Sequence, residues 1–165
     1  MIKKYVIVIS FLFAFFLPIS TMAISLNQTV KPFSGQEITS GKAMDMTDII
    51  GEKPVMIIFW ASWCPNCKEE VPKINQLVEK YRDMGMAFIG INVGFNDSVK
   101  RAQTFMAQTK MQYPVIFDKG GRVSKQFSIN GVPTIIVADR KGVVKFKNYG
   151  LPTISDDDFK ELLNN

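Results

Sequence analysis

Cys64 and Cys67 are the residues of this 165-residue chain whose type and spacing most directly offer chemistry, and they are its only cysteines. A disulfide across so short a loop removes little entropy from the unfolded chain, so it would be a poor structural staple. Two thiolates supply half of a tetrahedral zinc site, and the chain contains no His to complete one. The pair therefore predicts thiol–disulfide redox chemistry, with no metal and no cofactor.

The elements on either side of the pair predict how it is positioned. Residues 54–61 form a continuous apolar run, which is typical of a strand buried on both faces. Residues 65–83 carry apolar side chains at spacings of three and four, which predicts a helix. Cys64 then stands at a helix N-terminus, where unpaired N–H groups favour the thiolate over the thiol. Cys67 lies one turn further along and can attack a mixed disulfide on Cys64, so Cys64 is the predicted nucleophile and Cys67 the resolving cysteine.

The remaining pattern alternates between strands and helices. A buried strand is expected over 86–93, and a helix from the cap Asp97-Ser98 to about Thr109, with Val99, Ala102, Phe105 and Met106 on its inner face. After it we expect, in order, a strand at 114–117, a helix from 122 to about 127, a hairpin of 134–138 with 143–147, and a helix after Ser155. Residues 24–50 are interpreted as a short hairpin or a strand and loop of unassigned role. The order predicts an α/β fold: a three-layer sandwich with a mixed central sheet and helices on both faces.

The first 23 residues are expected to lie outside this fold. Lys3 and Lys4 precede an apolar run at 5–17, and Ala23 offers a small residue for cleavage, which is the pattern of a secretory signal peptide. An uncleaved anchor that tethers the protein to a membrane through residues 5–24 is the alternative. Either reading predicts a domain at 24–165 that is exported to the periplasm or the outer face of the cytoplasmic membrane. The formal charge of +5 is small and scattered, so no nucleic-acid partner is expected.

Three segments carry a family resemblance. The stretch 59–67, FWASWCPNC, resembles the active site of the thioredoxin superfamily, and Gly131-Val132-Pro133-Thr134 resembles its cis-proline loop. The continuation 67–72, CKEEVP, is similar to the TlpA/ResA-like group of exported thiol–disulfide oxidoreductases. The resemblance spans about residues 30–163. It implies a thioredoxin-like fold, protein disulfide substrates including apocytochrome c during cytochrome c maturation, and a membrane thiol–disulfide electron donor.

The resemblance also implies roles for residues around the cysteines. Trp63 would be a surface plate beside Cys64, whereas Trp60, inside the strand, is expected in the core. Val132 and the cis peptide before Pro133 would pair with a substrate strand. Glu70 would assist proton transfer to the buried cysteine; the alternative is a solvated first-turn acid like Glu69.

The residues between the cysteines bear on the direction of electron flow. Pro65 and Asn66 carry no charge, so no cation there stabilises the thiolate further, which favours a reductase. A dithiol oxidase on the same scaffold is the first alternative. A thiol peroxidase is another, because residues 113–123 resemble peroxiredoxins, although Ser62-Trp63-Cys64 departs from their Thr-x-x-Cys pattern. A copper-delivering thioredoxin-like protein is the last, and it would need a His that the chain lacks.

Overall fold

The computed structural model describes residues 24–164, and each expected element occurs there within a few residues of its predicted bounds. The strands are β1 (Ser34–Gln36), β2 (Ala43–Asp45), β3 (Val55–Trp60), β4 (Ala87–Asn92), β5 (Val115–Phe117), β6 (Thr134–Ala138) and β7 (Val144–Tyr149). The helices are α1 (Pro65–Tyr81), α2 (Val99–Thr109), α3 (Arg122–Gln126) and α4 (Asp156–Asn164), with a 3-10 turn at Met46–Asp48.

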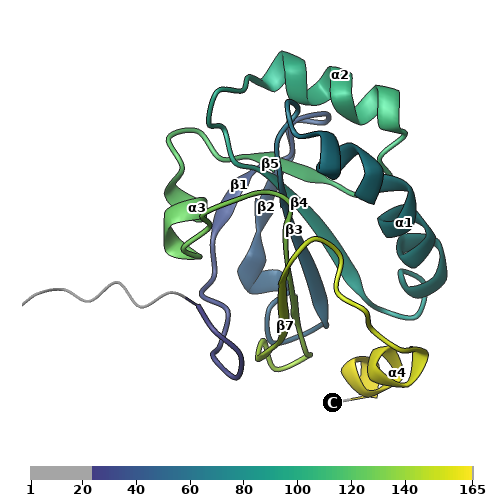
Figure 1. Ribbon diagram of the computed structural model, residues 1–165. Coiled ribbons are helices and arrows are strands. Elements are labelled where there is room, and N and C mark those ends of the chain that lie inside the picture. The colour runs from purple at the N-terminus through teal and green to yellow at the C-terminus, as the bar shows by residue number, and fades with distance from the viewer. Residues whose placement is uncertain (1–23, 165) are drawn as a thin grey trace, which may run out of the picture.

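A five-stranded mixed sheet forms the centre of the molecule (Figure 1). Its strand order is β5-β4-β3-β6-β7. β3 pairs in parallel with β4, and β4 with β5, whereas β6 runs antiparallel to both β3 and β7. The predicted α/β class and mixed sheet are confirmed.

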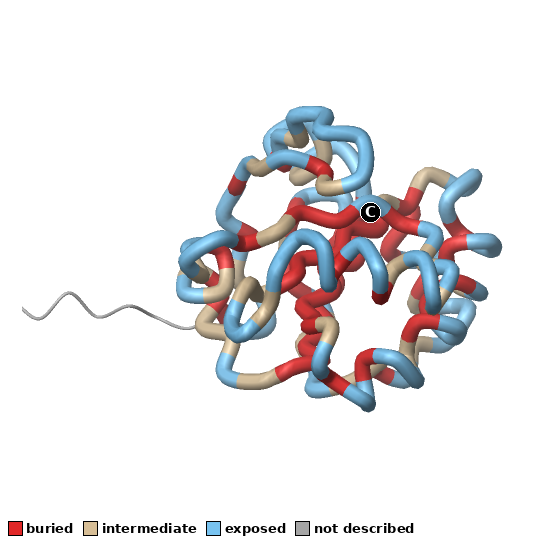
Figure 2. Tube along the Cα trace, turned by 90° about the horizontal axis from the view of Figure 1, so that it is seen from above, coloured by how far each residue is buried: buried red, intermediate tan, exposed pale blue. Residues whose placement is uncertain are grey.

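The central strand β3 is buried on both faces, as its unbroken apolar run predicts. Met56 and Ile58 belong to the hydrophobic core that α1 and α4 cover, together with Phe159. Ile57 and Phe59 belong to the core on the other face, where the ring of Phe59 lies 5.4 Å from that of Phe127 after α3. The buried residues accordingly run through the middle of the molecule between exposed outer layers (Figure 2).

The N-terminal segment 24–50 crosses one side of the sheet from edge to edge. It contains the β1–β2 hairpin, and isolated bridges join Thr29 to Val143 beside β7 and Glu37 to Ile116 in β5. Ile38 N–H also donates to Val115 O at 2.9 Å. The segment therefore covers both outer strands of the sheet, a role that the sequence left open.

Helix α2 confirms its predicted cap and most of its predicted inner face. Ser98 Oγ accepts from Arg101 N–H at 3.3 Å, Ala102 and Phe105 are buried, and Met106 is partly buried. The assignment of Val99 to the inner face was wrong, because this side chain is 42% exposed. Val99 is the first residue of the helix, and the helical pattern reaches the core only at the next turn.

The predicted signal peptide or anchor at 1–23 lies outside the described residues. Between residues 24 and 164, no helix combines the length and the hydrophobicity that crossing a membrane requires. The prediction of export therefore rests on the sequence pattern alone.

Candidate active site

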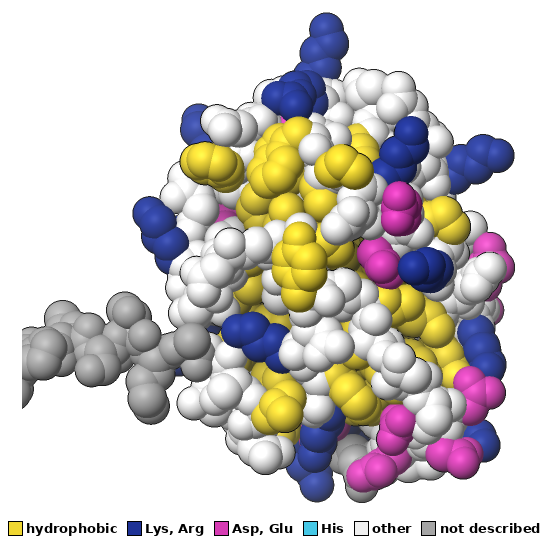
Figure 3. All heavy atoms as spheres, viewed as in Figure 1, with side chains coloured by type: hydrophobic (Ala, Val, Ile, Leu, Met, Phe, Trp, Pro, Cys, Tyr) yellow, Lys and Arg dark blue, Asp and Glu magenta, His cyan; other side chains and the backbone are white. Residues whose placement is uncertain are grey.

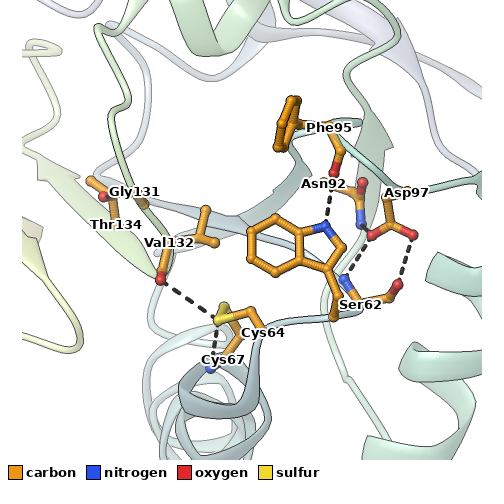
Figure 4. The surroundings of a disulfide bond; sticks show 10 residues. Ser62, Cys64, Cys67, Asn92, Phe95, Asp97, Gly131, Val132 and Thr134 are labelled. Atoms are coloured by element: carbon orange, nitrogen blue, oxygen red, sulfur yellow. Dashed lines mark hydrogen bonds between the residues drawn. A yellow bond between two sulfur atoms is a disulfide. The ribbon is translucent and has the colours of Figure 1, made fainter.

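Cys64 and Cys67 form a disulfide at the N-terminus of α1 (Figure 4). Cys64 is the N-cap, with extended backbone, and Pro65 follows at the first helical position, where its missing N–H costs nothing. The N–H of Cys67 donates to Cys64 Sγ at 3.1 Å. Both residues are buried: Cys64 is 5% exposed and Cys67 is 2% exposed. The helix N-terminus would stabilise a thiolate on Cys64 after reduction.

The loop before β6 lies against this disulfide. The Val132–Pro133 peptide bond is cis, as predicted, and Val132 O lies 3.6 Å from Cys64 Sγ. A disulfide sulfur carries no hydrogen, so Cys64 Sγ and Val132 O are only in contact in the oxidised protein. After reduction, Val132 O can accept a hydrogen bond from the Cys64 thiol. The antiparallel pairing of β3 with β6 brings together these residues, 68 positions apart in the chain.

The two tryptophans beside the motif occupy different environments, as expected. Trp60 is buried at the end of β3, and its indole stacks on Phe105 with ring centroids 4.8 Å apart. Trp63 is 43% exposed, and its Nε1 donates to Phe95 O at 2.7 Å. Trp63 therefore forms a fixed aromatic surface next to Cys64, and its indole is hydrogen-bonded to the loop after β4.

Asp97 holds the loop that carries the motif, a role that sequence reasoning missed. Its carboxylate accepts from Ser62 N–H at 2.7 Å, from Ser62 Oγ–H at 2.6 Å and from Asn92 Nδ2–H at 2.8 Å. It also accepts from Ser98 N–H at 2.8 Å. The sequence interpretation used Asp97 only as a helix cap, because nothing local indicates a contact with Ser62.

The Asp97 carboxylate is inaccessible to solvent, and Arg101 Nε lies 3.9 Å from its Oδ1. Burial alone would raise the pKa of Asp97, but the hydrogen bonds from Ser62, Asn92 and Ser98 outweigh it and hold that pKa below its ordinary value. Asp97 is thus an anion at neutral pH, directly beneath the residues that precede Cys64.

Glu70 lies on α1 one turn beyond Cys67, and its side chain is 16% exposed. Its Oε1 accepts from Lys73 Nζ at 3.3 Å. Its Oε2 is buried without a hydrogen-bond partner among the described residues. The neighbouring Glu69 is exposed, so the alternative of a fully solvated acid fits Glu69 and not Glu70. Glu70 follows Cys67 by three residues on the same helix. Among the described residues, no hydrogen bond joins Glu70 to either cysteine sulfur.

A metal site has no support in the described part of the chain. Residues 24–164 contain no group of three or more His, Cys, Asp or Glu side chains placed to hold an ion. The contacts of Cys64 Sγ described above come from a backbone N–H and a carbonyl oxygen, which carry no net charge.

Comparison with known proteins agrees with this geometry. The model of the AhpC/TSA family matches residues 26–147. The chain belongs to the AhpC/TSA family. The thioredoxin-like fold and the grouping expected from the sequence motifs are confirmed by relatives named as thiol–disulfide oxidoreductases and by solved structures of such proteins.

Two relatives and one structure illustrate the similarity. The thiol-disulfide oxidoreductase ResA of Bacillus thuringiensis subsp. konkukian is 33% identical over 104 residues, 63% of this chain and 58% of the relative. The protein of the same name from Geobacillus thermodenitrificans is 27% identical over 141 residues, 86% of this chain and 78% of the relative. A thiol:disulfide interchange protein of the thioredoxin family from Chlorobium tepidum has a TM-score of 0.68 and 26% identity, covering 86% of this chain and 97% of that one. The chain thus spans about 58% of the length of the first of these relatives.

Proposed function

We propose that this protein is a thiol–disulfide oxidoreductase that reduces disulfide bonds in other proteins outside the cytoplasm. The observation that carries the proposal is the Cys64–Cys67 disulfide at a helix N-terminus, in contact with the cis Val132–Pro133 loop. The printed names of the relatives support the same chemistry.

The first step is attack by the reduced protein on a substrate. The Cys64 thiolate attacks one sulfur of the substrate disulfide, and a mixed disulfide forms while the other substrate sulfur leaves as a thiolate that takes up a proton. The helix N-terminus and the Cys67 N–H stabilise Cys64 as the thiolate. Val132 backbone groups and the Trp63 surface hold the substrate segment in place.

The second step releases the product. Cys67 loses its proton and attacks Cys64 Sγ, which forms the intramolecular disulfide and expels the second substrate thiolate. Two electrons have then passed to the substrate; the first released thiolate takes its proton from water, and the second takes up the proton that left Cys67. We assign proton removal from Cys67 to Glu70, and the unpartnered, buried Oε2 supports this role because it has an acceptor position free.

The environment of Cys64 supports the reductase as the direction of electron flow. Neutral Pro65 and Asn66 stand between the cysteines, and the sulfur contacts uncharged backbone groups, so the thiolate lacks the cation that characterises strong oxidants. A reduction potential of about −270 mV or lower would support the reductase, and one near about −120 mV would support the dithiol oxidase instead.

The location and the partners belong to the same proposal. Residues 1–23 have the pattern that directs export or tethers a domain to the membrane, which supports a site at the periplasmic side. There a membrane thiol–disulfide donor would restore the dithiol after each turnover. Apocytochrome c is the proposed substrate during cytochrome c maturation.

A thiol peroxidase is the second candidate, because the AhpC/TSA match extends across the whole site. A resolving cysteine one turn from Cys64 suits disulfide exchange better, since it captures a mixed disulfide at once. Consumption of hydrogen peroxide by the reduced protein, at a rate that exceeds its rate with disulfides, would favour the peroxidase.

Trapping of the mixed disulfide tests the proposed function. Cys64→Ser should abolish turnover with a protein disulfide, because the attacking sulfur is gone. Cys67→Ser should accumulate a covalent complex with substrate, seen on a non-reducing gel and dispersed by dithiothreitol. Full multiple-turnover activity of Cys67→Ser would contradict the two-cysteine mechanism.

A further inference from the structure

The loop between α3 and β6 contains the only Asn-Gly pair of the chain, Asn130-Gly131. The main-chain nitrogen of a residue can attack the side-chain amide carbon of a preceding asparagine, and glycine hinders this attack least because it has no Cβ. The attack expels ammonia and leaves a succinimide ring, which water opens to aspartate or isoaspartate. An Asn-Gly pair in an accessible loop is therefore a candidate for spontaneous deamidation.

The Asn130 side chain is available for this chemistry. Asn130 is exposed, and its side chain has no partner among the described residues. The Gly131 N–H donates to no main-chain carbonyl in that part of the chain. Hydrogen bonds hold the loop only on either side: Ile129 N–H donates to Ser124 O at 2.9 Å, and Thr134 Oγ1 donates to Gly131 O at 2.7 Å. The attacking nitrogen and the amide that it attacks are thus both unbound.

Packing favours glycine at position 131. A Cβ there would lie 3.2 Å from Tyr149 Cε2, which is closer than ordinary van der Waals contact. A larger residue would shield the Asn130 amide from attack, but it would also press on the Tyr149 ring. The fold therefore favours the one residue that leaves Asn130 open to attack.

The pair lies directly before a residue that contacts the redox disulfide. Val132 O is 3.6 Å from Cys64 Sγ. Isoaspartate would add one methylene group to the main chain between residues 130 and 131, and this would displace Val132 from the sulfur. Either product would also place a new negative charge beside the site, and a nearby negative charge disfavours the Cys64 thiolate.

The new charge would stand apart from the other acidic groups on this face. The chain leaves α3 and crosses toward the sheet on the face that Figure 1 shows. On that face the acidic side chains lie mainly on the side of α1 and α4 (Figure 3). A carboxylate at position 130 would therefore change the charge of a region where acidic side chains are sparse.

We propose that Asn130-Gly131 is a self-modification site whose conversion to isoaspartate inactivates the protein. The Gly131 nitrogen forms a bond to Asn130 Cγ, the Cγ–Nδ2 bond breaks, and ammonia leaves with the proton that the nitrogen loses. Water then adds its hydroxyl group to one carbonyl carbon of the ring and returns a proton to the nitrogen, so water is the only other reactant. The loss of turnover rests on the proposed function, in which Val132 positions the substrate, whereas the modification itself does not.

Incubation of the full-length protein in mildly alkaline buffer tests the site, because base removes the proton from the attacking nitrogen. Peptide mapping by mass spectrometry should show Asn130 converted, while Asn148 keeps its amide; Asn148 is also exposed but lies in β7 before Tyr149. The isoaspartate form, separated by ion exchange, should reduce a protein disulfide at least about tenfold more slowly, since a misplacement of about 1 Å can cost about 100-fold.

Two variants separate the effects. Asn130→Gln is the matched control: its longer side chain cyclises far more slowly, so this variant should keep full turnover through the same incubation. Freshly prepared Asn130→Asp carries the charge without the added methylene group. It should raise the pKa of the Cys64 thiol, measured by alkylation rate against pH, and should keep more turnover than the isoaspartate form.

A synthetic peptide of residues 128–134 gives the rate of conversion without the fold. If the peptide loses its amide while Asn130 in the folded protein keeps it, the fold protects the pair and the site is overturned. If the isoaspartate form turns over as fast as the unmodified protein, or if Asn130→Gln loses turnover at the wild-type rate, the proposed inactivation is overturned. A freshly prepared wild type that reduces no disulfide would contradict the proposed function instead, because the masses report the modification without any activity.

Discussion

Two carboxylates lie near the redox cysteines, and their surroundings are opposite. Asp97 has no solvent-accessible side-chain surface and accepts four hydrogen bonds from three residues. Glu70 is 16% exposed, has one ion pair with Lys73, and keeps a buried oxygen without a partner. Both carboxylates lie near the end of a strand or the start of a helix. Only in Asp97 do both oxygens have hydrogen-bond donors.

The difference separates a positioning residue from a candidate proton acceptor. A fully hydrogen-bonded carboxylate is locked as an anion, because protonation would break the bonds that hold it. An unpartnered buried oxygen has a cost for the fold that a proton or a water would relieve. Asp97 therefore fixes the loop before Cys64, whereas Glu70 keeps one oxygen without a partner among the described residues, as the proton transfer proposed above requires.

The largest effect is expected from Asp97→Asn. The amide NH₂ takes the place of one oxygen and faces either Ser62 N–H or Ser98 N–H, which donate to different oxygens of Asp97, so the oxidised protein should lose about 3 kcal/mol of stability, the worth of one or two hydrogen bonds to a charge. Urea unfolding measures this loss. Asp157→Asn, at an exposed ion pair with Lys160 on α4, should change stability by less than about 0.5 kcal/mol. If Asp97→Asn and Asp157→Asn lost the same amount of stability, the buried Asp97 would contribute no more to the fold than an exposed carboxylate.

Low pH should remove the stability that the Asp97 carboxylate contributes. The pKa of Asp97 is lower in the folded protein than its ordinary value of 3.8. Its contribution is therefore complete well above pH 3.8 and is lost as the pH falls through the folded value. The gap in stability between the wild type and Asp97→Asn should be widest at pH 7 and should shrink below pH 3.8. A gap that stays constant down to about pH 2.5 would contradict a lowered pKa of Asp97 in the folded protein.

Glu70→Gln should act on rate rather than on stability. Loss of the proton acceptor should slow release of the mixed disulfide by about tenfold at pH 7 in a rapid-mixing experiment, and should remove one step from the pH profile. Stability should change by less than about 1 kcal/mol, because the interaction that is lost is the ion pair with the exposed Lys73. Glu69→Gln is the matched control on the same turn. An unchanged pH profile in Glu70→Gln would leave Glu70 as a structural acid.

The smallest effect is expected from Ser62→Ala. This change removes the 2.6 Å bond from Ser62 Oγ to Asp97 but keeps the bond from its backbone N–H, so about 1 kcal/mol of stability should be lost. Turnover should fall no more than about threefold, because the loop remains anchored. Urea unfolding and turnover with a model disulfide measure the two values. A loss as large as that of Asp97→Asn would place the anchoring in the hydroxyl rather than in the carboxylate.

Much of the site could be predicted from local sequence. A strand that ends a few residues before Cys64 and a helix that begins with Pro65 follow from the apolar run, the helical periodicity and the preference of proline for the first turn. The mixed sheet followed from the alternation of elements. The wrong placement of Val99 shows the limit of periodicity, which gives the direction of a helix face but not where along the helix the core begins.

The sequence by itself determined the reactive pair and the elements that carry it, because helix caps and apolar periodicity act over a few residues; the order of attack that it predicts stays a prediction. Only the tertiary structure decided what surrounds the pair. The pairing of β3 with β6 sets Val132 against Cys64, and Asp97 reaches back 35 residues to Ser62. Such contacts depend on how whole strands and loops pack, and no local pattern of residue types specifies them.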